Sequence, residues 1–408
     1  MKKLLLVGLL FSSCTVRYMI QDDIPQLDEQ AEDYILASGM SFPNNTERKI
    51  ITKSLYYIFG YIRQKFGEQQ FQKFYLSALH GTPLPEAARV TFGQTFYGML
   101  SEAYFSLAPV KQSGSEQMNV TNIGVFKVHY FPESAAEKDL PMIFYLLDNY
   151  FTAITNILVD SPQALANLKT NLSLMSDKSF QIFLYEERSQ TGSKSIADGY
   201  IGYTLEANKQ LIVPEIGLKT AYYNIFSSYV FSHELTHLLM GLTRFKTPLA
   251  PIVIPVPMQI SGNAMTDELY RYVMPIISSN FQNVEYALGN GWGEGIAEYV
   301  TSQCNLYFKY GLLDDVDNDL KYFMQKGGSL TPLPYLLDNG LWAGINQAMT
   351  RVHYQEMHSA VKFVAENHGW KKLIELINSP GGDADFLSLF ELSKQQFGEA
   401  WLASLKAE

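Results

Sequence analysis

The sequence predicts an α+β fold in which a sheet lobe lies between two helical regions. Strand-type patterns are confined to the middle of the chain, where Phe126, Val128 and Tyr130 alternate with polar residues. Before and after that segment, apolar residues recur every three or four positions, as on one face of a helix. We therefore expect four parts: a targeting segment at 1–22, a helical region at 23–115, the sheet lobe with a long last helix at 116–241, and a helical lobe at 242–408.

The composition is that of an ordinary globular protein. The chain has 408 residues, of which 47% are hydrophobic, enough for a large core and two or three subdomains. Its formal net charge is −10, and no basic stripe is present, which argues against nucleic acid as a partner. The same charge argues against direct electrostatic binding to anionic lipid.

The first 22 residues have the features of an export signal. A positively charged start and an apolar run at 4–11 precede Ser12, Ser13 and Cys14. This arrangement resembles a bacterial lipoprotein signal, which implies lipidation at Cys14 and anchoring to a cell envelope membrane, facing the periplasm or the cell surface. The alternative is a plain secretory signal in which Cys14 is incidental. The apolar run is too short to span a bilayer, so membrane contact is expected only through the lipid.

The helical region is predicted from apolar spacing. Residues 20–45 are polar and acidic, and we expect them to tether the body to its anchor. A helix is predicted from Ile51, and Gly67 is expected to end it. Further helices are expected at 69–79 and 85–107.

The sheet lobe is predicted to contain strands at 126–130 and 180–185, followed by a hairpin that pairs 200–205 with 210–213. His129 is expected to be an outward-facing strand residue and not a metal ligand. A long amphipathic helix is predicted between the first two strands from one apolar stripe: Ile143, Leu147, Tyr150, Ile154 and Leu158.

The pentapeptide HELTH has the spacing HExxH. On a helix, residues four apart lie one above the other, so His233 and His237 can bind one metal ion while Glu234 faces the water bound to it. Asn224 is expected to cap the start of this helix, and Gly241 is expected to end it in a left-handed conformation. The alternative is a buried helix with two hydrogen-bonded histidines.

A catalytic zinc ion takes three protein ligands and leaves a fourth position for water, so a third donor must come from elsewhere. The metzincin pattern HExxHxxGxxH fails, because Met240 and Thr243 stand at its glycine and histidine positions. In gluzincins the third ligand is a glutamate at the start of a later helix, and the stretch GWGEGIAEYV offers Glu294. Glu298, one turn further on, shares its face and would accept a hydrogen bond from a ligand imidazole. Taken alone, both acids would equally suit the start of an ordinary helix.

HELTH followed by WGEGIAEY resembles the gluzincin zinc peptidases, the group that contains thermolysin and the aminopeptidase N-like enzymes. The resemblance implies a mixed sheet lobe over the zinc helix, a helical lobe below it, one Zn²⁺ per chain on His233, His237 and Glu294, and an edge strand that binds the substrate backbone. Glu294 follows His237 by 57 residues (294 − 237), a longer gap than in aminopeptidase N-like enzymes. This gap contains the proline-rich run 247–257, which we interpret as an insertion that reshapes the cleft.

The resemblance also implies an oxyanion donor in the helical lobe, after the third ligand. The candidates are His353, Tyr354 and His358. Tyr354 is favoured, because the run from Tyr354 to Gly369 resembles the segment that the catalytic tyrosine opens in aminopeptidase N-like enzymes, with Met357 in place of its usual glycine. The alternative is that Tyr354 only packs at a helix start.

Two further patterns receive simple interpretations. An acidic run from Asp314 to Asp319 lacks the glycine and the terminal glutamate of an EF-hand loop, so it is predicted to be a solvated helix end. The stretch 204–208 resembles the amine-binding strand of aminopeptidase N-like enzymes only in part, and Glu206 is expected to be a hairpin-turn residue. Exopeptidase action therefore stays open.

The sequence leaves two classes of function. The first is a zinc-dependent peptidase that acts on a peptide or protein, in which Glu234 takes a proton from zinc-bound water and passes it to the leaving amine. The second is a catalytically inert surface lipoprotein that uses the same fold as a binding module. The intact HExxH motif together with Glu294 favours the enzyme.

Overall fold

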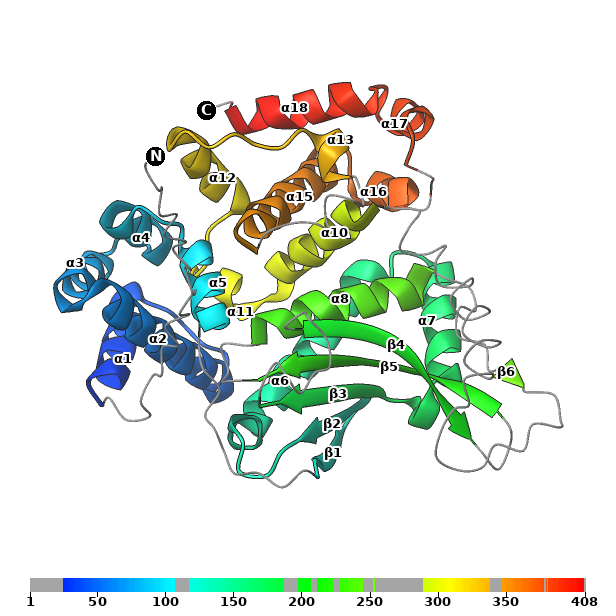
Figure 1. Ribbon diagram of the computed structural model, residues 1–408, viewed down its shortest axis with the longest axis horizontal. Helices are drawn as coiled ribbons and strands as arrows, with labels where there is room; N and C mark the ends of the chain where they lie inside the picture. Colours follow the sequence, from blue (N-terminus) through cyan, green and yellow to red (C-terminus); the bar gives the residue numbers. More distant parts are fainter. Residues whose placement is uncertain are drawn as a thin grey trace, which may run out of the picture.

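The computed structural model describes residues 25–106, 117–186, 197–206, 211–222, 228–244, 252–253, 289–337, 347–377, 379 and 381–406. These residues form one mixed sheet and many helices, which confirms the α+β class. Figure 1 shows the sheet with one group of helices beside it and another above it. The predicted export signal with Cys14, the cap residue Asn224 and most of the proline-rich run lie outside the described residues.

The N-terminal group of helices follows the predicted apolar spacing. The helix predicted from Ile51 begins earlier, after Asn44, whose side chain accepts a hydrogen bond from the backbone N–H of Glu47 at 2.9 Å. It ends before Gly67, as predicted, and the φ of 82° at Gly67 is one that favours glycine. The group comprises α1 (Pro25–Ser38), α2 (Asn45–Phe66), α3 (Glu68–Leu79), α4 (Leu84–Phe92) and α5 (Phe96–Ser106).

The expected tether at residues 20–45 is wrong from Pro25 onward. Residues 25–38 form α1, and Ala31, Tyr34 and Ile35 are buried in the common core. These three residues are spaced as on one helix face, so they form an apolar stripe among the acids. Tyr34 packs edge-on against Phe59 of α2, with ring centroids 6.3 Å apart.

The sheet has the strand order β1-β2-β3-β5-β4, with β6 paired to β5. β2–β3 and β3–β5 are parallel pairs, and the other pairs are antiparallel. The predicted strands at 126–130 and 180–185 are confirmed, and so is the hairpin, whose strands are longer than predicted. The strands are β1 (Asn119–Ile123), β2 (Phe126–Tyr130), β3 (Phe180–Tyr185), β4 (Ala197–Glu206), β5 (Leu211–Ala221) and β6 (Ile252–Val253).

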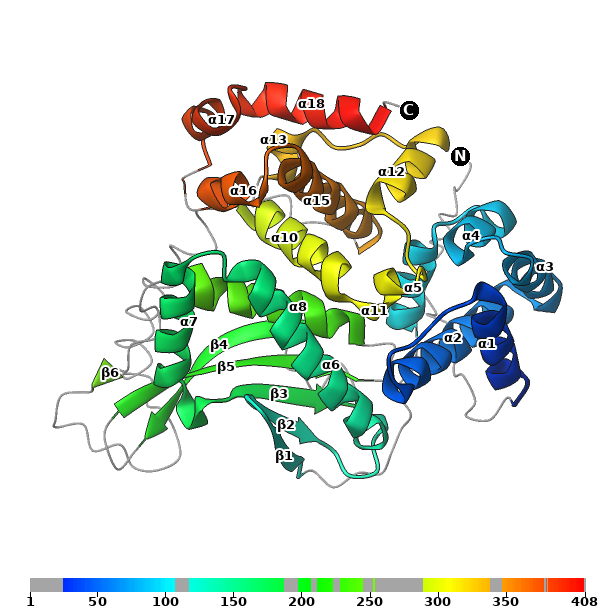
Figure 2. The ribbon, with the colours of Figure 1, turned by 180° about the vertical axis from the view of Figure 1, so that it is seen from behind.

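Three helices follow in this part of the fold: α6 (Ala135–Leu158), α7 (Pro162–Leu174) and α8 (Ser228–Arg244). α6 and α8 contact the sheet, and α8 packs against both α6 and α7. The predicted stripe of α6 is confirmed, since all five of its residues are buried. Figure 2 shows α6 crossing the sheet, and Figure 1 shows α8 alongside β4. The sheet and α6 thus hold the HExxH helix from two sides.

α8 does not end at Gly241, which is a correction to the sequence prediction. The helix continues to Arg244, and Gly241 lies inside it. Two asparagine side chains of α7 explain the difference: Asn171 donates to the carbonyl of Leu242 and Asn167 to that of Thr243, both at 2.9 Å. These amides satisfy carbonyls that a helix end leaves without partners, so no glycine cap is needed at that point.

The C-terminal group is helical, as predicted. It comprises α10 (Gly289–Cys304), α11 (Leu306–Lys309), α12 (Val316–Gln325), α13 (Leu333–Leu336), α15 (Gln347–Asn367), α16 (Trp370–Ile377), α17 (Asp383–Phe390) and α18 (Lys394–Lys406). α10 and α15 approach closely at Gly295, where an added Cβ would lie 2.6 Å from the carbonyl oxygen of Met357. Gly295 therefore sets the distance between these two helices.

The acidic run at Asp314–Asp319 starts a helix, as predicted, since the Asp315 side chain caps α12. It is not solvated throughout: Asp319 is only 3% exposed and accepts from Arg89 of α4 at 3.1 Å. The prediction failed here because the partner comes from a distant part of the sequence. The ion pair joins the N-terminal helices to the C-terminal group.

One hydrophobic cluster runs through all three groups of elements, with Phe59, Ile143, Phe231, Ile296 and Val361 among its fully buried members. α8 and α10 both lie within it, so the two helices that carry the motif residues share a common core. Within the described ranges, no helix combines the length and the apolar character that crossing a membrane would require.

Candidate metal centre

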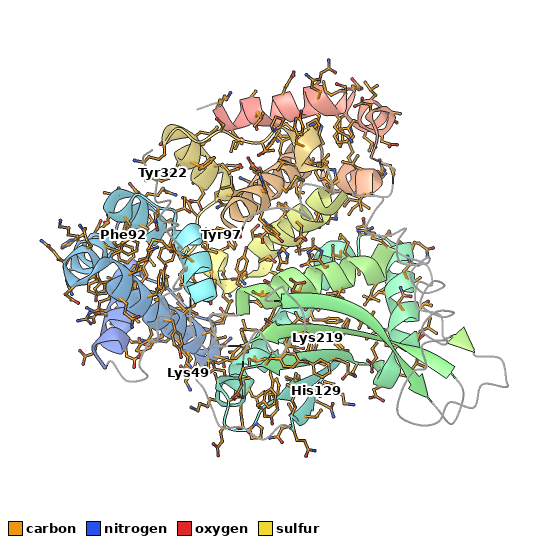
Figure 3. All side chains as sticks on the ribbon, in the orientation of Figure 1. Lys49, Phe92, Tyr97, His129, Lys219 and Tyr322 are labelled. Carbon is orange, nitrogen blue, oxygen red and sulfur yellow. The ribbon has the colours of Figure 1, made fainter. Side chains whose placement is uncertain are left out.

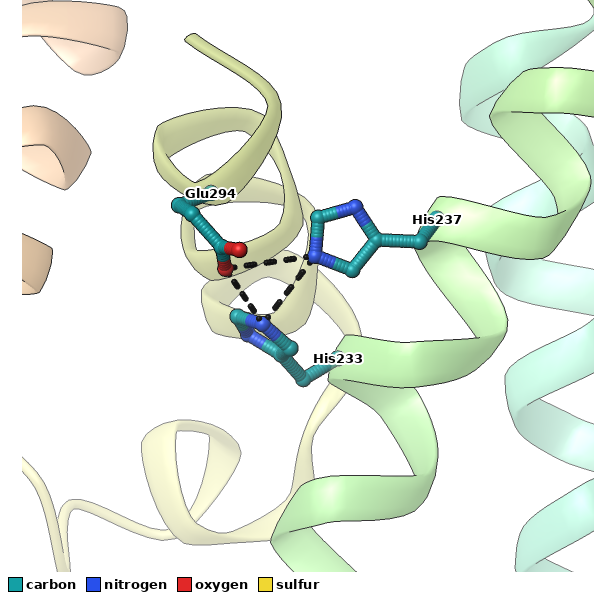
Figure 4. A group of neighbouring side chains, drawn as sticks. All are labelled: His233, His237 and Glu294. Carbon is teal, nitrogen blue, oxygen red and sulfur yellow. Dashed lines mark hydrogen bonds and ion pairs between the residues drawn. The ribbon is translucent and has the colours of Figure 1, made fainter. Parts of the chain in front are cut away.

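α8 and α10 bring His233, His237 and Glu294 together (Figure 4). The Nε2 atom of His233 lies 3.0 Å from Oε2 of Glu294 and 3.2 Å from Nε2 of His237. The third side of the triangle, from His237 Nε2 to Glu294 Oε2, is 3.3 Å. The three donor atoms thus lie at nearly equal distances from one another.

This donor set fits a zinc ion. Zinc bonds of 2.0–2.1 Å in a tetrahedral arrangement place neighbouring donors about 3.3 Å apart, close to the separations observed here. Two imidazoles and one carboxylate are the protein ligands of one established class of catalytic zinc site. The side chain of His233 is 10% exposed, whereas those of His237 and Glu294 are 26% and 23% exposed, so the cluster opens to solvent on one side.

The charges in the cluster are strongly coupled. Burial lowers the pKa of His233, but the carboxylates of Glu294 and Glu298 outweigh it and raise the pKa well above the ordinary value. The pKa of His237 is also raised, since the Glu294 carboxylate outweighs burial. Burial would raise the pKa of Glu294, but the two histidines hold it far below its usual range. A bound cation would replace these protons, so metal binding should release protons.

Glu298 stands behind His233, as the sequence predicted. Its Oε1 atom lies 3.0 Å from Nδ1 of His233, and its Oε2 accepts a hydrogen bond from the hydroxyl of Tyr229 at 2.6 Å. Glu298 is 4% exposed, so these contacts are shielded from water. A carboxylate in this position fixes the tautomer of a ligand imidazole.

Glu234 and Tyr354 border the same cluster. The rings of Tyr354 and His233 are edge-on, with centroids 5.9 Å apart. Burial raises the pKa of Tyr354, and the charges of Glu294, Glu234 and Glu298 raise it further, so the hydroxyl stays protonated. Glu234 is half-buried, and its charge also acts on His237. A hydrogen-bond donor and a carboxylate therefore flank the donor triangle.

The two histidines that competed with Tyr354 make other contacts. His353 pairs through Nδ1 with Glu356 at 2.6 Å, and both side chains are buried. Nε2 of His358 lies 3.2 Å from the hydroxyl of Ser302, and burial lowers the pKa of His358 to about 4. Of these three candidates, only Tyr354 has a ring contact with a residue of the donor triangle in the described part of the chain.

Two residues of the sheet lobe that the sequence singled out lie elsewhere. His129 stacks on Phe183, with centroids 4.2 Å apart, and its Nε2 lies 2.8 Å from the amide oxygen of Gln181 (Figure 3). Glu206 is the last residue of β4 and pairs with Leu211 where the hairpin turns. β4 itself lies at one edge of the described sheet, next to α8.

The sequence analysis assigned no role to Tyr229 at the site. The residue lies four positions before His233, so both side chains lie on the same face of α8. That spacing was a usable signal. The partner of its hydroxyl, Glu298, lies on another helix, and the spacing alone does not reveal it.

The chain matches no protein-family model, no curated protein and no solved structure. The interpretation of the metal centre therefore depends on the geometry of the described residues.

Proposed function

We propose that this protein is a zinc-dependent peptidase that hydrolyses peptide bonds in a peptide or protein substrate. The observation that carries the proposal is the grouping of His233, His237 and Glu294, with donor atoms 3.0–3.3 Å apart. Glu234 and Tyr354 beside this triangle supply the two further groups that hydrolysis of an amide needs, a proton acceptor and an oxyanion donor.

In this proposal His233, His237 and Glu294 hold one Zn²⁺ per chain. When bound, zinc lowers the pKa of a water molecule and polarises the scissile carbonyl. The carboxylate of Glu234 accepts the proton of the attacking water and passes it to the leaving amine. The hydroxyl of Tyr354 donates to the oxyanion of the tetrahedral intermediate, and Glu298 keeps His233 in the tautomer that binds metal.

The arrangement of elements supports a gluzincin-type fold for this peptidase. The HExxH helix α8 lies alongside the edge strand β4, and α10 brings Glu294 from the C-terminal helical group. An extended substrate would pair by backbone hydrogen bonds with β4, which is an edge strand of the described sheet. Endopeptidase and exopeptidase action are both compatible with this arrangement.

Removal of the metal tests the proposal. We expect the purified protein to contain one zinc ion per chain and to hydrolyse an unstructured protein such as casein. A chelator should abolish the hydrolysis, and added Zn²⁺ should restore it, because Glu234 alone does not activate water sufficiently. Metal content and casein cleavage are measured on the same samples. Hydrolysis that persists without metal would exclude the mechanism, and a zinc-bound protein that cleaves nothing in a peptide library would favour the binding module.

Replacement of Tyr354 tests the oxyanion donor. Tyr354→Phe is expected to retain zinc and fold and to lower kcat by roughly 10²–10³, the usual effect of removing one such donor. KM should change little, since the hydroxyl acts mainly in the transition state. His358→Ala is the matched comparison, because His358 lies one turn further along α15 and contacts Ser302. If His358→Ala is the inactive variant, the role belongs to that histidine.

We also propose, from residues 1–22, that the protein is exported and anchored to a bacterial cell envelope membrane by lipid at Cys14. A positively charged start, an apolar run and small residues before the cysteine support this location. Incorporation of a labelled fatty acid through Cys14 decides between lipid anchoring and plain secretion.

A further inference from the structure

The hydroxyl of Tyr229 has no role in the proposed hydrolysis, yet it lies one contact away from a proposed zinc ligand. It donates to Oε2 of Glu298 at 2.6 Å, while the other oxygen of the same carboxylate lies 3.0 Å from Nδ1 of His233. Glu298 is 4% exposed, and Tyr229 is partly buried. The contact is therefore a part-buried, charge-assisted hydrogen bond, which is stronger than one between neutral groups.

A second tyrosine extends this chain of contacts into the N-terminal helices. Tyr97 of α5 packs edge-on against Tyr229, with ring centroids 6.2 Å apart, and a side-chain hydrogen bond joins the two residues. Figure 3 labels Tyr97 on α5, the N-terminal helix drawn next to the start of α8. The contacts thus run from α5 through α8 to α10 and back to His233 on α8.

The direction of the hydrogen bond between Tyr229 and Glu298 follows from the chemistry of the two groups, because a carboxylate oxygen accepts and a hydroxyl donates. A hydroxyl has a single proton, and Tyr229 donates its proton to Glu298. Oε1 of the same carboxylate lies 3.0 Å from Nδ1 of His233. Glu298 therefore lies between the Tyr229 hydroxyl and a proposed zinc ligand.

This arrangement matters for the metal because an imidazole ligates through a nitrogen that carries no proton. With a proton of His233 held on Nδ1, Nε2 is the nitrogen that gives up its proton to a metal, and this is the atom that lies 3.0 Å from Oε2 of Glu294. Loss of the Tyr229 hydroxyl would leave one carboxylate oxygen without its donor in a buried site, and the carboxylate would lose a constraint on its rotation.

We propose that Tyr229, supported by Tyr97, is a positioning residue of the metal centre, because it holds Glu298 in the orientation that fixes the metal-binding tautomer of His233. The inference rests on the proposed zinc site and deepens it. It also makes α5, and through it the N-terminal helical region, a structural part of the centre.

The test measures zinc affinity by competition with a chromophoric chelator, using the full chain. Tyr229→Phe removes only the hydroxyl and keeps the ring contacts with Tyr97 and Phe308. We expect its zinc affinity to fall roughly 10-fold, the lower end of the loss that follows removal of a group in contact with a ligand, because Tyr229 acts through Glu298. Tyr97→Phe should give a smaller decrease in the same direction, since it acts on Glu298 only through Tyr229. Equal affinity in Tyr229→Phe and wild type would overturn the proposal.

Tyr222→Phe is the matched control. Tyr222 is also a buried tyrosine whose hydroxyl donates to a buried carboxylate, that of Asp139, at 3.1 Å, and its ring stacks on Phe231 of α8. Within the described residues its hydroxyl contacts Asp139 and neither the donor triangle nor Glu298, so removal of this hydroxyl should leave zinc affinity unchanged. If Tyr222→Phe weakens zinc binding as much as Tyr229→Phe does, the effect is a general one on α8 and the positioning role is wrong.

A double-mutant cycle tests the route through Glu298. In a Glu298→Gln background the carboxylate that Tyr229 orients is already gone, so adding Tyr229→Phe should weaken zinc binding much less than it does in wild type. An undiminished effect would show that Tyr229 acts by another route. Wild-type protein that binds no zinc would remove the proposed function itself, whereas tight binding by wild type and by Tyr229→Phe alike would remove only this inference.

Discussion

Glu234→Gln is expected to lower turnover by roughly 10²–10⁴ while zinc stays bound, the usual range for loss of a general base. Glutamine has the shape of glutamate, but its amide oxygen does not accept the proton of the attacking water at neutral pH. His233, His237 and Glu294 keep their positions in this variant, so the metal content should match that of wild type. The measurement is kcat on an unstructured protein with zinc content determined in the same sample.

The surroundings of Glu234 support a chemical role for it. The carboxylate is half-buried, and its charge raises the pKa values of both His237 and Tyr354, so it lies near the metal centre and the proposed oxyanion donor. Glu375→Gln is a suitable control, because this residue of α16 forms a surface ion pair with Lys371 at 3.7 Å and contacts no residue of the donor triangle in the described part of the chain. A Glu234→Gln enzyme with bound zinc and near wild-type turnover would rule out Glu234 as the base.

Local patterns predicted the elements whose residues are close in the sequence. The stripe of α6 and the alternation in β2 were read correctly, because burial of one face depends on spacing alone. HExxH spacing likewise places His233 and His237 one turn apart on α8, whatever else surrounds them. These features follow from helix and strand periodicity, which a single sequence contains in full.

Features that depend on distant partners were not predictable in this way. The end of α8 is set by Asn167 and Asn171 of α7, so the expected stop at Gly241 was wrong. Apolar residues of α1 form a stripe that is buried only because α2 lies against it, so the segment was misinterpreted as a tether.

The choice between Tyr354 and His358 shows the same limit within the site. The two residues are one turn apart on α15, so periodicity places both on similar faces. Which of them reaches the metal centre depends on how α15 lies across α10. That contact is fixed by Gly295, above which the carbonyl of Met357 leaves no room for a side chain. The sequence shows that residue 295 is a glycine, but it does not show that the carbonyl oxygen of Met357 lies next to it.

The grouping of Glu294 with the two histidines leads to the second large expected effect, the loss of zinc in Glu294→Ala. Structural zinc sites with four protein ligands bind Zn²⁺ with a free energy of about 10–16 kcal/mol, or about 3 kcal/mol per ligand. Loss of one ligand should therefore lower the zinc affinity of this protein by roughly two to three orders of magnitude. Part of the loss is offset, because the Glu294 carboxylate raises the pKa values of His233 and His237 and its removal favours their neutral, metal-binding forms. Hydrolysis should disappear at zinc concentrations that saturate the wild type.

Comparison with Glu298→Ala distinguishes a zinc ligand from a residue that positions a ligand. Glu298 contacts Nδ1 of His233, whereas the donor triangle contains Nε2 of that residue. Loss of Glu298 should therefore weaken zinc binding by only about 10–100-fold. Both variants are measured by chelator competition, and circular dichroism of the metal-free proteins checks that each is folded. The expected order of zinc affinity is wild type, then Glu298→Ala, then Glu294→Ala. The reverse order for the two variants would show that Glu298 is the third ligand and that Glu294 only supports the site.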